Sequence, residues 1–285
     1  MATIIRRRKL GMSSAKGIAE FSKAGITWCR NDKGIPDDNL YIRWGCTSNV
    51  PNHNATVLNP AKAIHQVNDK LGFRKTLDEA ELCPATHFFT AQQAAMYEPN
   101  INTPDGEFVA RPPTHAQGRN IFAGNFAACV AQLNRWGKGG GYVSRKVDKV
   151  AEYRVFVVQG RAVCVAQKTP ADANALAWNV AKGGRFDNVR WDNWPLQAVR
   201  RSIEAFNLTK LDFGGVDVMV DANGDSTILE INSAPSLTSP YRQECMAKAF
   251  DYIVENGRER IPLIEARGGY KKFIHPAICD NALLV

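Results

Sequence analysis

Two acidic residues and one asparagine have the types and the spacing of ligands for a divalent cation. They are Asp217, Glu230 and Asn232, and they stand in two segments rich in β-branched residues. The dipeptide Asn223-Gly224 lies between these segments and is a strong signal for a two-residue turn. If it forms the tip of a hairpin, Asp217 lies directly opposite Glu230. The sequence therefore predicts two carboxylates at one point of a sheet.

Alternation along the two strands separates an apolar face from a polar face. The apolar residues are Val216, Val218, Val220, Leu229 and Ile231, and the polar residues are Asp217, Asp221, Glu230 and Asn232. Two opposed carboxylates repel by about 3 kcal/mol at an effective dielectric constant near 20, so a cation should lie between them. Their hard oxygens suit Mg²⁺ or Mn²⁺.

A second interpretation is a solvent-facing hairpin whose acids pair with Lys or Arg. A plain surface hairpin has no need of Asn232 beside Glu230, nor of Gly215 opposite Asn232. These two residues favour the metal site.

Length and composition bound the class of protein. With 285 residues and 45% hydrophobic content, the chain can form two or three subdomains around one cleft. It has no uncharged apolar stretch of about 18 to 20 residues, and no apolar segment follows Arg6-Arg7-Arg8-Lys9. We therefore expect no membrane span and no secretion signal. The net charge of +8 favours anionic partners: nucleotides, acidic metabolites or nucleic acid.

The seven cysteines are scattered and form no CxxC pair. An odd number without close pairs argues against a disulfide framework and against a zinc site. We expect a reducing, cytoplasmic compartment, and isolated buried thiols are favoured over a catalytic cysteine.

Periodicity and turn signals predict an α+β chain in four parts. Residues 1–58 form a small α/β N-terminal domain, with strands over 2–5, 27–30 and 40–44 and a helix from Ser13-Ser14 to Ala24. Residues 59–142 begin with helices over 59–71, capped by Asn59-Pro60, and 76–82, and continue with helices over 91–96 and 125–135 and strands over 107–111 and 141–147. Residues 143–258 hold β segments over 152–158 and 161–168, a helix over 194–206, the hairpin and a helix over 243–255, and residues 259–285 form a C-terminal tail.

In this order the segments resemble the ATP-grasp superfamily, most nearly the branch of ligases that add glutamate to a ribosomal protein. The matching pieces are Asn59-Pro60 to Asp69-Lys70, Phe108 to Pro112, His115 to Arg119, Glu152 to Arg154, Gln167-Lys168, Asn179, Gly215 to Asp217 and Leu229 to Pro235. The resemblance implies an ATP-grasp fold in which two α+β subdomains close on ATP. It also implies a carboxylate–amine ligase that forms an acyl phosphate, releases ADP and phosphate, and leaves an amide.

The resemblance assigns roles to single residues. The nucleotide-binding positions are Lys70, Arg111, Gln117, Gly118, Lys146, Val147 and Glu152. Of these, Lys70 and Arg111 match phosphate-binding positions, although lysine is usual at Arg111, and Gln117-Gly118 match a flap over the phosphates. The catalytic positions are Arg154, Lys168 and Asn179, and the metal ligands are Asp217, Glu230 and Asn232. A cross-strand ion pair for Glu152 and Arg154, and a turn role for Asn179, stay open as alternatives.

Two departures from the family pattern support a rival interpretation. Basic residues fill the hinge at 143–147, where an acid is common, and Ala177-Trp178 replaces a frequent arginine. The rival is a regulatory or scaffold protein that binds ATP without catalysis. A third interpretation, a nucleic-acid-binding module that uses Arg6 to Lys9, is less favoured than a solvated strand edge. As partners we expect carboxylate and amine substrates, small molecules or peptides, with an acidic one favoured by the basic surface; a homo-oligomer is compatible with the family.

Overall fold

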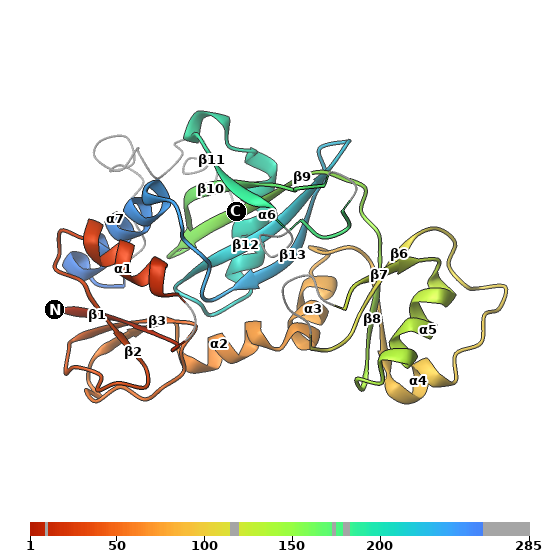
Figure 1. Cartoon of the computed structure of the whole chain (residues 1–285), viewed down its shortest axis with the longest axis horizontal. Helices are drawn as coiled ribbons and strands as arrows, with labels where there is room; N and C mark the ends of the chain where they lie inside the picture. The colour runs from red at the N-terminus through yellow and green to blue at the C-terminus, as the bar shows by residue number, and fades with distance from the viewer. Residues whose placement is uncertain (9–10, 115–119, 173–174, 179–182, 259–285) are drawn as a thin grey trace.

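Three β-sheets lie in a row along the molecule (Figure 1). The structure is a computed structural model, and it describes residues 1–8, 11–114, 120–172, 175–178 and 183–258. The predicted C-terminal tail, 259–285, lies outside the described residues. Among the described residues, no helix has the length and apolar character that crossing a membrane requires.

The N-terminal sheet is fully parallel, as an α/β unit requires. Its order is β2 (Thr27–Arg30), β1 (Ala2–Arg6), β3 (Leu40–Trp44) and β4 (Thr56–Leu58). The predicted strands 27–30 and 40–44 are confirmed, and β4 was not predicted. Helix α1 (Met12–Phe21) is shorter than predicted, because Ser14 does not cap it. The Ser14 hydroxyl instead accepts a hydrogen bond from the amide of Leu237 (3.0 Å).

The linking helices break at Asp69, inside the predicted helix 59–71. Helix α2 (Ala61–Asn68) ends there, and α3 (Lys70–Glu79) begins with the Asp69 side chain accepting from the Gly72 amide (3.0 Å). Asn59 was predicted to cap the first helix, but its side chain accepts from the amide of Asp212 (2.8 Å). The break puts Lys70 on the first turn of α3.

The small sheet is antiparallel and carries two helices on one face (Figure 1). Its order is β5 (Thr86–Thr90), β8 (Gly140–Arg145), β6 (Phe108–Arg111) and β7 (Phe122–Gly124), and its helices are α4 (Ala91–Ala95) and α5 (Phe126–Trp136). Phe126 and Phe108 stack edge to face in its core, with ring centroids 5.1 Å apart. These elements match the predicted ones closely.

The large sheet holds the predicted hairpin. Its antiparallel order is β11 (Arg185–Val189), β10 (Arg161–Thr169), β9 (Lys149–Val158), β12 (Phe213–Asp221) and β13 (Ser226–Asn232). Helix α6 (Leu196–Asn207), preceded by a short 3₁₀ turn at Trp191–Asn193, packs on the face that carries Val155, Val216 and Ile231. Helix α7 (Pro240–Asn256) packs on the opposite face together with the N-terminal sheet.

The tip of the hairpin differs from the prediction. Val220 pairs with Ser226, so the loop is longer than the predicted two-residue turn. An extra residue in β13, Leu229, then restores the predicted pairing of Asp217 with Glu230. This bulge also turns Leu229 out of the apolar core, and Ile228 takes its place there.

Candidate active site

Charged side chains from four adjacent strands gather on one face of the large sheet. The register pairs Asp217 with Arg154 of β9 on one side and with Glu230 of β13 on the other. Directly paired residues of antiparallel strands project to the same face. We call the following set the charged face: Lys149, Glu152, Arg154, Lys168, Asp217, Glu230 and Asn232.

The charged face continues an apolar face along the same strands. On β9, Phe156 and Val158 alternate in step with Arg154 and belong to the core under α7 and the N-terminal sheet. Phe213 stands in the same relation to Asp217 on β12. The N-terminal sheet and α7 therefore cover one end of this face, and the charged residues occupy the other end.

Asp217 is the centre of a buried ion-pair network. The Arg154 guanidinium donates to both carboxylate oxygens of Asp217, at 2.6 Å from Nε and 2.8 Å from Nη2. Lys168 Nζ donates to the same carboxylate at 2.9 Å and also pairs with Glu152. Burial alone would raise the pKa of Asp217, but Arg154 and Lys168 outweigh it and hold that pKa well below its usual range.

Lys149 extends this network, and sequence alternation places it on the wrong face. Its Nζ lies 2.6 Å from Glu152 Oε2. The register of β9 shifts between Ala151 and Lys149, so Val150 is an extra residue and Lys149 turns to the face of Glu152. Burial lowers the pKa of the Lys149 ammonium, and Lys168 and Arg111 lower it further, against the opposing effect of Glu152.

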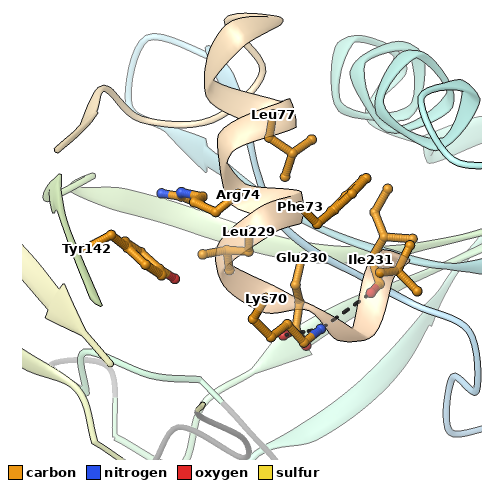
Figure 2. Close-up of a pocket in the computed structure, with 9 residues that line it drawn as sticks. Lys70, Phe73, Arg74, Leu77, Tyr142, Leu229, Glu230 and Ile231 are labelled. Carbon is orange, nitrogen blue, oxygen red and sulfur yellow. Dashed lines mark hydrogen bonds and ion pairs between the residues drawn. The ribbon is translucent and has the colours of Figure 1, made fainter. Parts of the chain in front are cut away.

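Glu230 and Asn232 form the more open part of the charged face. The Glu230 side chain is 36% exposed, and Lys70 Nζ lies 3.4 Å from its Oε2. Asn232 Nδ2 donates to Glu230 Oε1 at 3.0 Å, so the amide oxygen of Asn232 is not used in that bond. Burial would raise the pKa of Glu230, but Lys70 and Asn232 lower it more. Figure 2 shows Lys70 reaching across to Glu230 and to the carbonyl of Ile231.

The three predicted metal ligands differ in how well they fit a cation. The described residues contain no cluster of three or more His, Cys, Asp and Glu side chains suited to a metal, so the test rests on a mixed set of two acids and one amide. Glu230 and Asn232 offer hard oxygen ligands of the kind Mg²⁺ takes. A carboxylate accepts at about four positions, and three of those of Asp217 are filled by Arg154 and Lys168. In its contacts, Asp217 matches the alternative in which acids pair with Lys or Arg.

A crevice beside Glu230 contains residues that the sequence analysis missed. It has room for about one water molecule, about 20 Å³, between α3 and β13 (Figure 2). The Arg74 guanidinium lies over the Tyr142 ring at 5.2 Å and donates to the Ile228 carbonyl at 3.5 Å. Leu229 lines this crevice because the bulge turned it away from the core. No periodicity in the sequence signals that bulge.

The remaining predicted nucleotide-binding residues lie at the junction with the small sheet or outside the described residues. Arg111 ends β6, close enough to Lys149 to affect its pKa. Lys146 and Val147 lie between β8 and β9, and Lys146 pairs with Glu107 and with Asp148 (3.3 Å). Three predicted residues, Gln117, Gly118 and Asn179, lie outside the described part of the chain.

Two aromatic residues cover the cations of the charged face. The Phe186 ring centroid lies 4.8 Å from the Arg154 guanidinium and 5.7 Å from Lys168 Nζ. The Trp178 ring lies 4.6 Å from Lys149 Nζ, at the position where the family often has arginine. Such contacts favour desolvated cations by up to about 2 kcal/mol. The alternation in β11 gave no reason to single out Phe186.

The balance of charge indicates an anionic ligand. Four cations of the region are Lys70, Lys149, Arg154 and Lys168, and Arg111 stands beside them. They face three carboxylates, those of Glu152, Asp217 and Glu230, which leaves a net charge of +2. An arrangement of paired, buried cations beside open oxygen ligands can bind phosphate groups with their metal and stabilise charge that develops on them.

Comparison by sequence identifies the family. A family model described as an ATP-grasp domain matches residues 59–252. This confirms the superfamily that the sequence analysis named; its nearer resemblance to ribosomal-protein glutamate ligases stays a prediction. Comparison with curated proteins returned no match.

Comparison by structure shows the same fold. D-alanine–D-alanine ligase from Bacillus anthracis superposes with a TM-score of 0.62 at 12% identity, covering 90% of this chain and 96% of the ligase. A RiPP-associated ATP-grasp ligase of Chryseobacterium gregarium, in complex with ADP and a leader and core peptide, gives 0.61 at 13% identity, covering 91% and 98%. D-cycloserine synthetase gives 0.59 at 15% identity, covering 89% and 100%. The predicted α+β, ATP-grasp fold class is confirmed.

Proposed function

This chain belongs to the ATP-grasp superfamily, and we propose that it is an ATP-dependent carboxylate–amine ligase. The observation that carries the proposal is the charged face, where paired cations lie next to Glu230 and Asn232. The ADP and ATP complexes among similar ligases support ATP as the nucleotide. The parts that would close on ATP are residues 59–142 and 143–258, built around the small and the large sheet.

In the first half-reaction, an oxygen of the substrate carboxylate attacks the γ-phosphorus of ATP. The bond from that phosphorus to the β,γ-bridging oxygen breaks, ADP leaves, and an acyl phosphate forms. Arg154 and Lys168 are fixed by Asp217, so they can neutralise the transferred phosphoryl group without reorganising. Lys70 and Arg111 would hold the remaining phosphates.

In the second half-reaction, an amine attacks the acyl carbon, the bond from carbon to phosphate oxygen breaks, and the amine loses a proton as the amide forms. The chain's task is to hold the acyl phosphate away from water and to stabilise the departing phosphate with Arg154 and Lys168. Glu230 and Asn232 would hold Mg²⁺ or Mn²⁺, with Asp217 limited to its one remaining acceptor position. When bound, the metal supplies positive charge to the nucleotide phosphates.

The rival function is ATP binding without ligation. Trp178 supports it, since an aromatic ring covers Lys149 where the family often has an arginine. A regulatory protein would bind ATP and Mg²⁺ but release no ADP with any acid and amine.

A hydroxamate assay separates these functions. Purified protein is incubated with ATP, Mg²⁺, pooled carboxylic acids and hydroxylamine, and hydroxamate and ADP are measured together. The ligase proposal predicts both products in equal amounts, since hydroxylamine replaces the amine. Formation of AMP would instead indicate adenylation, and nucleotide binding without any product would favour the rival.

The variant Glu230→Ala tests the site within the same assay. We expect less than about a tenth of wild-type ADP release, equivalent to at least about 1.4 kcal/mol of transition-state stabilisation. Glu204→Gln is the matched control, because Glu204 is an exposed acid of α6 paired with Arg201. Retention of more than a tenth of the turnover by Glu230→Ala would contradict the assignment.

A further inference from the structure

A second cluster of cations lies at the carboxyl edge of the N-terminal sheet. The strands β1 and β2 end in Arg6 and Arg30, which pair in the register, and β3 ends in Arg43 and Trp44. Arg7 and Arg8 follow β1 directly and are exposed. Among the described residues, Asp32 is the only carboxylate that forms an ion pair with any of these five arginines. The cluster therefore keeps a net charge of +4.

Two of the arginines are buried without an acidic partner. Arg6 is 3% exposed, and its Nη1 donates only to the carbonyls of Arg7 and Arg8. Arg43 is 9% exposed, and its Nη2 donates to the carbonyl of Ser48 (2.9 Å). In both, Nε is buried and has no hydrogen-bond partner. Buried charges in proteins are normally paired, so these two point to a ligand that brings negative charge.

A third buried donor lies at the same edge. Trp44 is fully buried, and its Nε1 has no hydrogen-bond partner. Arg6 pairs with Trp44 in the register, so the two lie on one face of the sheet, whereas Arg43 lies on the other. Donors therefore reach this edge from both faces. The carboxyl edge of a parallel sheet is where ligands commonly bind in α/β folds.

The edge borders the charged face of the large sheet. Gly45, directly after Trp44, has a positive φ of 64°, and a Cβ built on it would lie 2.7 Å from the Cβ of Ala234. Ala234 follows Asn232 by two residues, a span of at most about 7 Å. A molecule of modest size could therefore contact the arginines at one end and the charged face at the other.

We propose that this edge binds a second anionic group, a carboxylate or a phosphate, of the substrate whose carboxylate is activated at the charged face. The substrate class is then a compound with two anionic groups, such as a dicarboxylic amino acid or a phosphorylated one. The inference rests on the proposed ligase function for its second half, and on Arg6, Arg43 and Trp44 for its first. It gives the basic run that begins at Arg6 a function within the reaction.

The test is calorimetric titration of the full chain, saturated with Mg²⁺ and a non-hydrolysable ATP analogue so that the phosphate sites of the charged face are filled. The probes are L-glutamate, O-phospho-L-serine and L-glutamine. We expect one of the two anionic probes to bind at least about tenfold more tightly than L-glutamine, and the preferred one identifies the group. Equal binding of L-glutamine, or no binding of either anionic probe, would overturn the proposal.

Variants locate the bound anion. Arg43→Gln and Arg8→Gln should each weaken the preferred anionic probe by about tenfold, and Lys16→Gln should not. Lys16 is an exposed residue of α1 paired with Glu20, so its variant loses the same charge elsewhere. Arg8 is exposed, so Arg8→Gln keeps the test valid if Arg43→Gln does not fold. Equal weakening by all three, or tight binding of single-stranded RNA in place of the probes, would contradict the proposal.

The outcome is distinguishable from that of the ligase proposal. If the anionic probe binds through the arginines but no acid gives hydroxamate, the anion site stands and the ligase function fails. If hydroxamate forms equally from neutral and dianionic acids, and Arg43→Gln has no effect, the ligase function stands and the anion site fails.

Discussion

Asp217 and Glu230 lie opposite each other on one hairpin, yet their surroundings differ. Asp217 is 2% exposed and accepts three hydrogen bonds from Arg154 and Lys168. The Glu230 side chain is 36% exposed and contacts one ammonium, that of Lys70, and one amide. The inner half of the charged face is thus fixed by its own ion pairs, whereas the outer half can exchange partners.

This difference assigns separate tasks to two acids of the same type. The pairs of Asp217 place Arg154 and Lys168 in defined positions, and removing one partner of a buried pair leaves an uncompensated charge. The contact of Glu230 with Lys70 is long and partly solvated, so it contributes little to stability. Stability should depend on the inner half, and ligand binding on the outer half.

The largest expected effect is that of Asp217→Asn. It removes the carboxylate and leaves Arg154 and Lys168 buried without it, which should lower the free energy of unfolding by about 3–5 kcal/mol. Urea denaturation followed by circular dichroism measures this, with Glu204→Gln as the control. A loss below about 1 kcal/mol would show that the inner half does not carry the stability.

Acid should narrow the gap between wild type and Asp217→Asn. The pKa of Asp217 is lower in the folded protein than its ordinary value of 3.8. Its contribution is therefore complete well above pH 3.8 and is lost progressively as the pH falls below that value. Between about pH 5 and about pH 3 the difference in unfolding free energy should shrink by about 1 kcal/mol. A constant difference would contradict the assigned direction of the pKa shift.

The smallest expected effect on stability is that of Glu230→Gln. Its partly solvated ion pair with Lys70, at 3.4 Å, should contribute less than about 1 kcal/mol. The same denaturation series checks this. A loss as large as that of Asp217→Asn would erase the distinction between the two halves.

The sequence predicted the centre of the site for a sound reason, although one step in the derivation was wrong. Strand alternation and the Asn223-Gly224 signal gave the pairing of Asp217 with Glu230, which the structure confirms. The loop is longer than the signal predicts, and the bulge at Leu229 compensates. Two errors in opposite directions cancelled at Asp217, but Leu229 itself was placed on the wrong face.

Features that depend on irregular backbone could not be predicted from periodicity. The extra residue at Val150 turns Lys149 toward Glu152, and the break at Asp69 sets Lys70 on the first turn of α3. Both arise from local hydrogen bonding and tertiary packing, which leave no period in the sequence. Buried donors without partners, such as Arg43 Nε, are likewise visible only once the fold is known.

Manganese binding tests the central claim most directly. Mn²⁺ is titrated into the protein with a non-hydrolysable ATP analogue, and free Mn²⁺ is followed by electron paramagnetic resonance. We expect wild type and Glu204→Gln to bind the ion equally, and Glu230→Gln to bind it at least about tenfold more weakly while it stays folded. Unchanged Mn²⁺ affinity in Glu230→Gln would contradict the assignment of the charged face as the site of the nucleotide and its metal.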